Sequence, residues 1–176
     1  MTINDVVFPW LRERLRIFER QEGLDDDSFA SLHRAFLQSY FHPRGDFLVT
    51  PRRRTAVSRR SSSDLSTNSF HDYAVSVVAA DLEGDTPILI WELRRGECRT
   101  KVLDYSEWAE SHLDWKKFLR VEELPTVHVV RIEKDKVRTF LVRDGWLEDQ
   151  VEYPSVLDEG LSAWLGELVA KREHIT

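Results

Sequence analysis

The sequence contains a single cysteine, Cys98, and only seven glycines in 176 residues. One cysteine cannot form an intramolecular disulfide or a zinc site built from several thiolates, which favours a reducing compartment. Neither glycine-rich phosphate loop, G-x-x-x-x-G-K-[ST] or G-x-G-x-x-G, occurs. The H-E-x-x-H helix of zinc peptidases and the G-x-S-x-G elbow of acyl hydrolases do not occur either. The sequence therefore gives no support to these motif-defined chemistries.

Long apolar runs are missing as well. No stretch approaches the roughly 20 apolar residues that span a bilayer, and charged side chains accumulate from Arg12 onward, unlike a secretory signal. The formal net charge is −6, so no overall basic field attracts nucleic acid or anionic lipid. We expect a cytoplasmic or nuclear protein with no membrane partner, in which any nucleic-acid contact comes from a local patch.

The hydrophobic pattern is that of one globular domain, with 41% hydrophobic and 32% charged residues. Helical spacing of apolar residues predicts helices over 5–20, 27–41, 104–121 and 155–172. Apolar stretches bounded by turn residues predict strands over 46–50, 72–79, 87–93, 126–133, 137–144 and 146–153. We therefore expect a single α/β domain over 1–176, with a mixed, mainly antiparallel sheet flanked by helices.

One segment breaks this pattern. Residues 51–69 are rich in arginine and serine and contain little to bury, so the segment cannot offset its ordering entropy and is predicted to be a mobile loop. Three interpretations stay open: a solvated loop, a kinase site at Ser62 whose phosphate would offset the positive charge, or a contact with the phosphate backbone of nucleic acid. The arginines available for that contact are Arg52, Arg53, Arg54, Arg59 and Arg60.

The hairpin expected over 72–94 is the segment that can carry chemistry. In the register we expect, Asp72 lies opposite Arg94 and Ala74 lies opposite Glu92, all on one face of the sheet. Asp72 is then diagonal to Glu92, at the roughly 7–8 Å typical of diagonal neighbours. Two carboxylates can share a cation across that gap. Mg²⁺ prefers such oxygen ligands, and it can generate hydroxide and stabilise charge on a phosphoryl group.

An acid on one strand, followed by E-x-basic on the next, resembles the PD-(D/E)xK nuclease superfamily. Here the acid is Asp72, and the second strand ends in the run from Glu92 to Arg94. The superfamily's helix, three strands, helix and strand are similar to the order expected from residue 5 to residue 133. The resemblance implies a restriction-endonuclease-like core and metal-dependent phosphodiester hydrolysis of nucleic acid. It also implies that Asp72 and Glu92 hold Mg²⁺, with a further acid from the first helix, Glu13 or Glu19.

The sequence departs from the superfamily at Arg94, which stands in place of the lysine. Arginine cannot lose a proton to activate water, but it can hold a phosphate through two hydrogen bonds. The substitution therefore favours phosphate binding over water activation. A member of the superfamily that has kept the fold and lost catalysis is a natural alternative.

Other hypotheses need no metal. Asp72 can simply begin a strand while Glu92 pairs with Arg94 or Arg95. The domain can be a non-catalytic interaction or regulatory module that contacts a protein partner through residues 51–69, or a nucleic-acid binder without cleavage.

Histidines and aromatic residues add little to these hypotheses. His71, His112, His128 and His174 show no metal-ligand spacing. The aromatic stripe of the helix expected over 104–121, formed by Tyr105, Trp108 and Trp115, favours core packing over a base-stacking platform.

Overall fold

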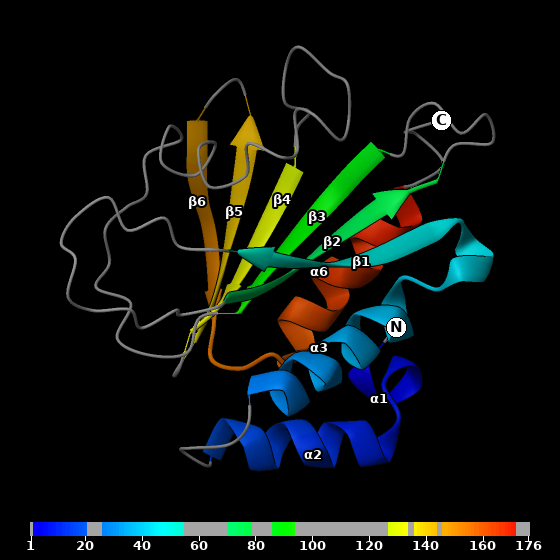
Figure 1. Ribbon diagram of the computed structural model, residues 1–176, viewed down its shortest axis with the longest axis vertical. Helices are drawn as coiled ribbons and strands as arrows, with labels where there is room; N and C mark the ends of the chain where they lie inside the picture. The colour runs from blue at the N-terminus through cyan, green and yellow to red at the C-terminus, as the bar shows by residue number, and fades with distance from the viewer. Residues whose placement is uncertain are drawn as a thin grey trace, which may run out of the picture.

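The computed structural model describes residues 2–20, 26–54, 70–78, 86–93, 127–133, 136–143 and 146–171. Within them, a six-stranded sheet lies beside a group of helices (Figure 1). The strands follow one another in chain order across the sheet. Neighbouring strands are antiparallel except for β3 and β4, which are parallel. The expected α/β class with a mixed, mainly antiparallel sheet is confirmed.

The helical elements are α1 (Ile3–Val6), α2 (Pro9–Arg20), α3 (Asp26–Tyr40), the 3-10 turn η1 (Pro43–Gly45) and α6 (Glu159–Ala170). The strands are β1 (Phe47–Arg54), β2 (Phe70–Val77), β3 (Thr86–Leu93), β4 (Val127–Ile132), β5 (Val137–Arg143) and β6 (Trp146–Tyr153). All six predicted strands are present. The helix predicted over 104–121, with Tyr105, His112 and the other residues of its stripe, lies outside the described residues.

The first predicted helix is divided in two. α1 ends at Val6, and the next residue, Val7, has an extended backbone with φ −99° and ψ 124°. α2 starts two residues later at Pro9, because the proline ring has no N–H to donate but fits the first position of a new helix. The last helix is also shorter than predicted. It begins after Asp158, whose side chain accepts a hydrogen bond from the Gly160 N–H at 2.8 Å.

The boundary of the predicted mobile loop is wrong at its start. β1 extends through Pro51 to Arg54, and its last residues are in register with the beginning of β2. Backbone hydrogen bonds of a strand ladder need no apolar side chains, so composition alone missed this extension. Pro51 is tolerated because β1 is an edge strand. The remaining part of the predicted loop, residues 55–69, lies outside the described residues.

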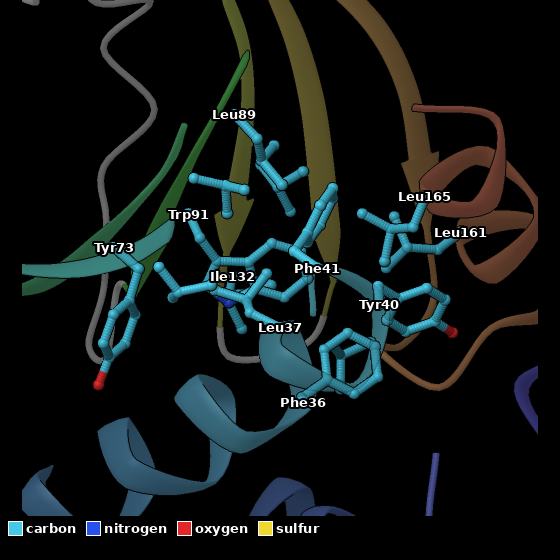
Figure 2. Packing of buried hydrophobic residues seen from close by; sticks show 14 of the residues in the cluster. Phe36, Leu37, Tyr40, Phe41, Tyr73, Leu89, Trp91, Ile132, Leu161 and Leu165 are labelled. Carbon is cyan, nitrogen blue, oxygen red and sulfur yellow. The ribbon is translucent and has the colours of Figure 1, made fainter. Parts of the chain in front are cut away.

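Helices α1, α2, α3 and α6 gather on one side of the sheet, which we call the helix-side face (Figure 1). Alternate residues of β2 and β3, such as Tyr73, Leu89 and Trp91, are buried there in one cluster with residues of α3 and α6 (Figure 2). Two buried hydrogen bonds connect α3 to the sheet: Tyr73 Oη donates to the Ala30 carbonyl at 2.7 Å, and Trp91 Nε1 donates to His33 Nδ1 at 3.1 Å.

The opposite face of the sheet, which we call the far face, is buried as well. Its apolar residues alternate with those of the helix-side face and lie outside the cluster that the helices form. They are Ala74, Ile90, Val127, Val129, Phe140 and Val142, all no more than 4% exposed. Burial on both faces explains why β3 and β4 read as nearly continuous apolar runs. No helix among the described residues is long and apolar enough to cross a bilayer.

Candidate functional site

Asp72 is the direct register partner of Glu92. The predicted register placed Asp72 opposite Arg94 and Ala74 opposite Glu92, and it is wrong, because Ala74 is opposite Ile90. At Asp72 the pairing is displaced by two residues from the predicted register, and the register changes by one residue between Val75 and Ser76. Because side chains alternate with a period of two residues, this displacement leaves Asp72 and Glu92 on the same face of the sheet. Direct neighbours are about 4.5–5.5 Å apart at Cβ, closer than the diagonal pair we predicted.

The register continues this pair into a line of charged residues across the whole sheet, which we call the charged row. Each strand contributes one member. In order from β1 to β6 they are Arg52, Asp72, Glu92, Arg131, Arg138 and Glu152. Every member has a residue of opposite charge as one register neighbour, so the two like-charged steps of the row are each flanked by compensating charge.

The centre of the charged row is a buried ion pair. Arg131 Nε donates to Glu92 Oε2 at 2.8 Å, and the two side chains are 4% and 0% exposed. Glu92 belongs to the far face, because its neighbours Trp91 and Leu93 both point into the helix-side cluster. Charged groups this far from water are tolerated only when they are paired and hydrogen-bonded. The Glu92 carboxylate is therefore held by a cation that the chain itself provides.

An aromatic ring supports the two arginines of the row. The guanidinium carbons of Arg131 and Arg138 lie 5.1 Å and 5.0 Å from the centroid of the Phe140 ring. Cations over an aromatic face are attracted by its quadrupole, which helps two like charges to occupy neighbouring register positions.

Toward β6 the charges become exposed. Arg138 Nη2 binds Asp149 Oδ1 at 3.0 Å, and Lys136 Nζ lies 3.2 Å from Glu152 Oε2. The two acids are 62% and 57% exposed, so these pairs stabilise the protein far less than the central pair does.

The predicted acid from the first helix does not join the site. Glu13 lies on α2, on the helix side of the sheet, and its 64% exposed carboxylate pairs with Arg16 at 3.5 Å. The sheet therefore separates Glu13 from Glu92. The structure therefore does not bring Glu13 together with Glu92, because α2 packs against α3 on the helix side of the sheet.

Glu19 has a structural role. Its Oε1 accepts hydrogen bonds from Ser155 Oγ at 2.7 Å and from the Val156 N–H at 3.3 Å. These bonds fasten the end of α2 to the turn that precedes α6.

Among the described residues, no group of three or more histidine, cysteine, aspartate or glutamate side chains could hold a metal ion. The one described carboxylate at the predicted site, Glu92, already binds Arg131. Asp72 is placed by its backbone register alone.

The predicted nucleic-acid contact residues form two groups. Arg52, Arg53 and Arg54 belong to the edge strand β1, where Arg52 is also a member of the charged row. The other predicted contact residues, Arg59, Arg60 and Arg94, lie outside the described residues, as do Ser62 and Arg95.

Sequence reasoning missed Arg131, although a signal was present. Arg131 is the one arginine, lysine or acid in the mainly apolar strand Val127–Ile132. A charged side chain in a fully buried strand requires a buried counter-charge. The sequence indicates that Arg131 requires a buried counter-charge, but only the parallel pairing of β3 and β4 identifies Glu92 as the partner.

His128 lies on the helix-side face and is not part of the charged row. Its ring meets Trp164 of α6 edge to face, with centroids 5.3 Å apart. Burial and the positive charge of Lys171 lower the pKa of His128 below its usual 6.5.

Comparison with known proteins adds no relative. No family model matches the chain, and neither the curated proteins nor the solved structures contain a match. The functional argument therefore rests on the residues of the site.

Proposed function

We propose that this protein is a nucleic-acid-binding domain on a scaffold that resembles the PD-(D/E)xK nucleases, and that it binds without cleaving. The order α3, β1, β2, β3 and then β4 parallel to β3 supports the scaffold. The shared face of Asp72 and Glu92 supports the resemblance of the site. The observation that carries the non-cleaving part is the buried contact between Glu92 and Arg131.

A metal ion would compete with Arg131 for the Glu92 carboxylate. A divalent cation would have to displace a charge-assisted hydrogen bond of 2.8 Å and leave Arg131 buried beside the metal. Separating a buried ion pair costs about 3–5 kcal/mol, which corresponds to roughly two to four orders of magnitude in metal affinity. Arg131 thus provides the positive charge beside Glu92 that Mg²⁺ would provide in the catalytic hypothesis.

Nucleic acid would be held through positive charge at the edge of the sheet. Arg52, Arg53 and Arg54 follow one another at the end of the edge strand β1. Phosphate contacts of this kind release counterions, so affinity falls as salt rises. Arg94 is proposed as a further phosphate ligand because of its two-pronged donor geometry. The single cysteine of the sequence agrees with a cytoplasmic or nuclear location for this function.

The test combines binding and degradation. Anisotropy of labelled single- and double-stranded oligonucleotides measures affinity at two salt concentrations, and gels measure degradation with Mg²⁺ or Mn²⁺. We expect salt-dependent binding that is weakened by the triple substitution Arg52→Glu, Arg53→Glu and Arg54→Glu. We expect no metal-dependent degradation. The absence of binding at low salt would refute the proposal.

A second candidate, metal-dependent phosphodiester hydrolysis, is favoured by the direct register of Asp72 and Glu92. It requires Arg131 to release Glu92. Degradation that depends on metal and disappears in Glu92→Gln would select this candidate. The related hypothesis of a protein-binding regulatory module shares the non-catalytic scaffold. Its proposed contact segment lies mostly in residues 55–69, so loss of partner binding on deletion of that segment is its test.

A further inference from the structure

The outer surface of α2 exposes an unusual amount of apolar area. The inner surface of the helix buries Leu11 and Leu15 in the core. Trp10 and Ile17, seven residues apart on α2, are 54% and 41% exposed, and Phe8, which precedes the helix, is 64% exposed. Phe8 and Trp10 are the only large aromatic residues among the exposed hydrophobics of the described chain. Two exposed aromatic rings close together in the chain indicate a contact surface.

The same surface is positively charged. The α2 sequence contains four arginines and two glutamates, in a chain whose net charge is −6. Both glutamates are engaged: Glu13 by Arg16 and Glu19 by the turn before α6. Arg14 and Arg20 are exposed and provide the net charge. The surface therefore complements an anionic partner.

Aromatic and cationic groups are also in contact with each other. The Arg14 guanidinium carbon lies 5.8 Å from the centroid of the Trp10 ring. Proteins that bind single-stranded nucleic acid combine these two elements: aromatic rings on which bases stack and cations that track the backbone.

Other occupants fit less well. A second copy of the same surface would bring two positive faces together. A helix that lies in a membrane inserts its main apolar face, but the corresponding residues of α2, Leu11 and Leu15, are already buried in the core.

We propose that Phe8, Trp10, Arg14 and Arg20 form a contact site for single-stranded nucleic acid. Bases stack on Trp10 and Phe8, and the two arginines bind phosphates. This inference rests on the proposed function for its ligand class. It adds a second surface, separate from the arginines of β1, and a preference for single strands, because bases in a duplex have no free face to stack on an exposed ring.

The experiment uses labelled (dT)12 and a 12-base-pair duplex, with anisotropy as the readout on the full chain. Trp10→Ala is expected to weaken (dT)12 binding about fivefold or more and to change duplex binding little, because base–aromatic stacking is lost. The double substitution Arg14→Gln and Arg20→Gln is expected to reduce the salt dependence of (dT)12 affinity. All three positions are exposed, so the variants should fold, which circular dichroism checks.

Matched controls are available on other surfaces. Val151→Ala removes an exposed apolar side chain from β6, and Arg44→Gln removes an exposed arginine from η1. Both are expected to bind (dT)12 like the wild type.

The outcomes separate this inference from the proposed function. Unchanged (dT)12 affinity in Trp10→Ala, together with loss in the β1 triple variant, overturns the α2 site alone. No binding of either oligonucleotide overturns both. A Trp10-dependent dimer in sedimentation, or Trp10-dependent binding to anionic vesicles, with unchanged (dT)12 affinity, also overturns it.

Discussion

Arg131 and Glu92 show how one residue pair can decide between chemical hypotheses. From the sequence, Glu92 is a carboxylate in the right place for a metal. In the structure it is a carboxylate in the right place for a guanidinium, 2.8 Å away and out of contact with water. Arg131 of β4 provides this guanidinium, and the ion pair favours a structural role for Glu92 over metal binding.

The contribution of the Glu92–Arg131 ion pair to the free energy of unfolding can be measured. Replacing Arg131 with methionine leaves Glu92 charged and buried, so we expect the free energy of unfolding to fall by about 3–5 kcal/mol in urea denaturation. The double variant Arg131→Met, Glu92→Gln should lose less than the sum of the two single variants, because neither charge is left uncompensated.

Lys136→Met is the control. Its partner Glu152 is exposed, and exposed pairs contribute about 0–1 kcal/mol. Strict additivity of the Glu92 and Arg131 substitutions would show that the two side chains do not act as a pair.

His128 predicts a pH dependence. Its pKa is lowered in the folded protein by burial and by Lys171, so between the lowered pKa and about 6.5 the unfolded chain binds more protons than the folded one. Stability is therefore expected to be fully present above the unfolded value and to decrease as the pH falls below it. Urea denaturation between pH 7.5 and 5 measures the effect.

The variant His128→Leu should remove this part of the pH dependence. His42→Asn, at an exposed histidine that caps η1, should retain it. A wild-type stability that rises on acidification through this range would contradict the assignment.

At the scale of the elements, the hydrophobic pattern predicted the features that depend on residues close together in the sequence. The strand positions followed from apolar stretches, and the faces of β2 and β3 followed from alternation. Pairing in the hairpin was missed, because the strands begin to pair at Val77 and Thr86 and not at the predicted Ala79 and Pro87. The shared face of Asp72 and Glu92 survived this error, since an even displacement preserves which side of a sheet a residue occupies.

The connection between α3 and β2 gives an element-scale prediction. Tyr73 Oη donates a buried hydrogen bond to the Ala30 carbonyl. Tyr73→Phe removes the donor and should lower the free energy of unfolding by about 1 kcal/mol. Tyr153→Phe, at a half-buried tyrosine of β6, should change it by less than about 0.5 kcal/mol. Equal effects in the two variants would mean that this bond does not fasten the helix to the sheet.

At the scale of the whole molecule, the site depends on a contact that no local pattern contains. Glu92 and Arg131 are 39 residues apart, and they meet because β4 lies parallel to β3. A parallel pair needs a crossover connection, and residues 94–126 are long enough to make one. The sequence could therefore predict Asp72 and Glu92 as a pair, but it could not predict the strand pairing that places Arg131 beside Glu92.

The central claim is that Glu92 is committed to Arg131 and does not hold a metal. Isothermal titration of Mn²⁺ into the wild type and into Glu92→Gln tests it most directly. We predict that the two proteins give the same heats at each Mn²⁺ concentration. Saturable heat in the wild type that disappears in Glu92→Gln would contradict the account and restore the metal-dependent nuclease.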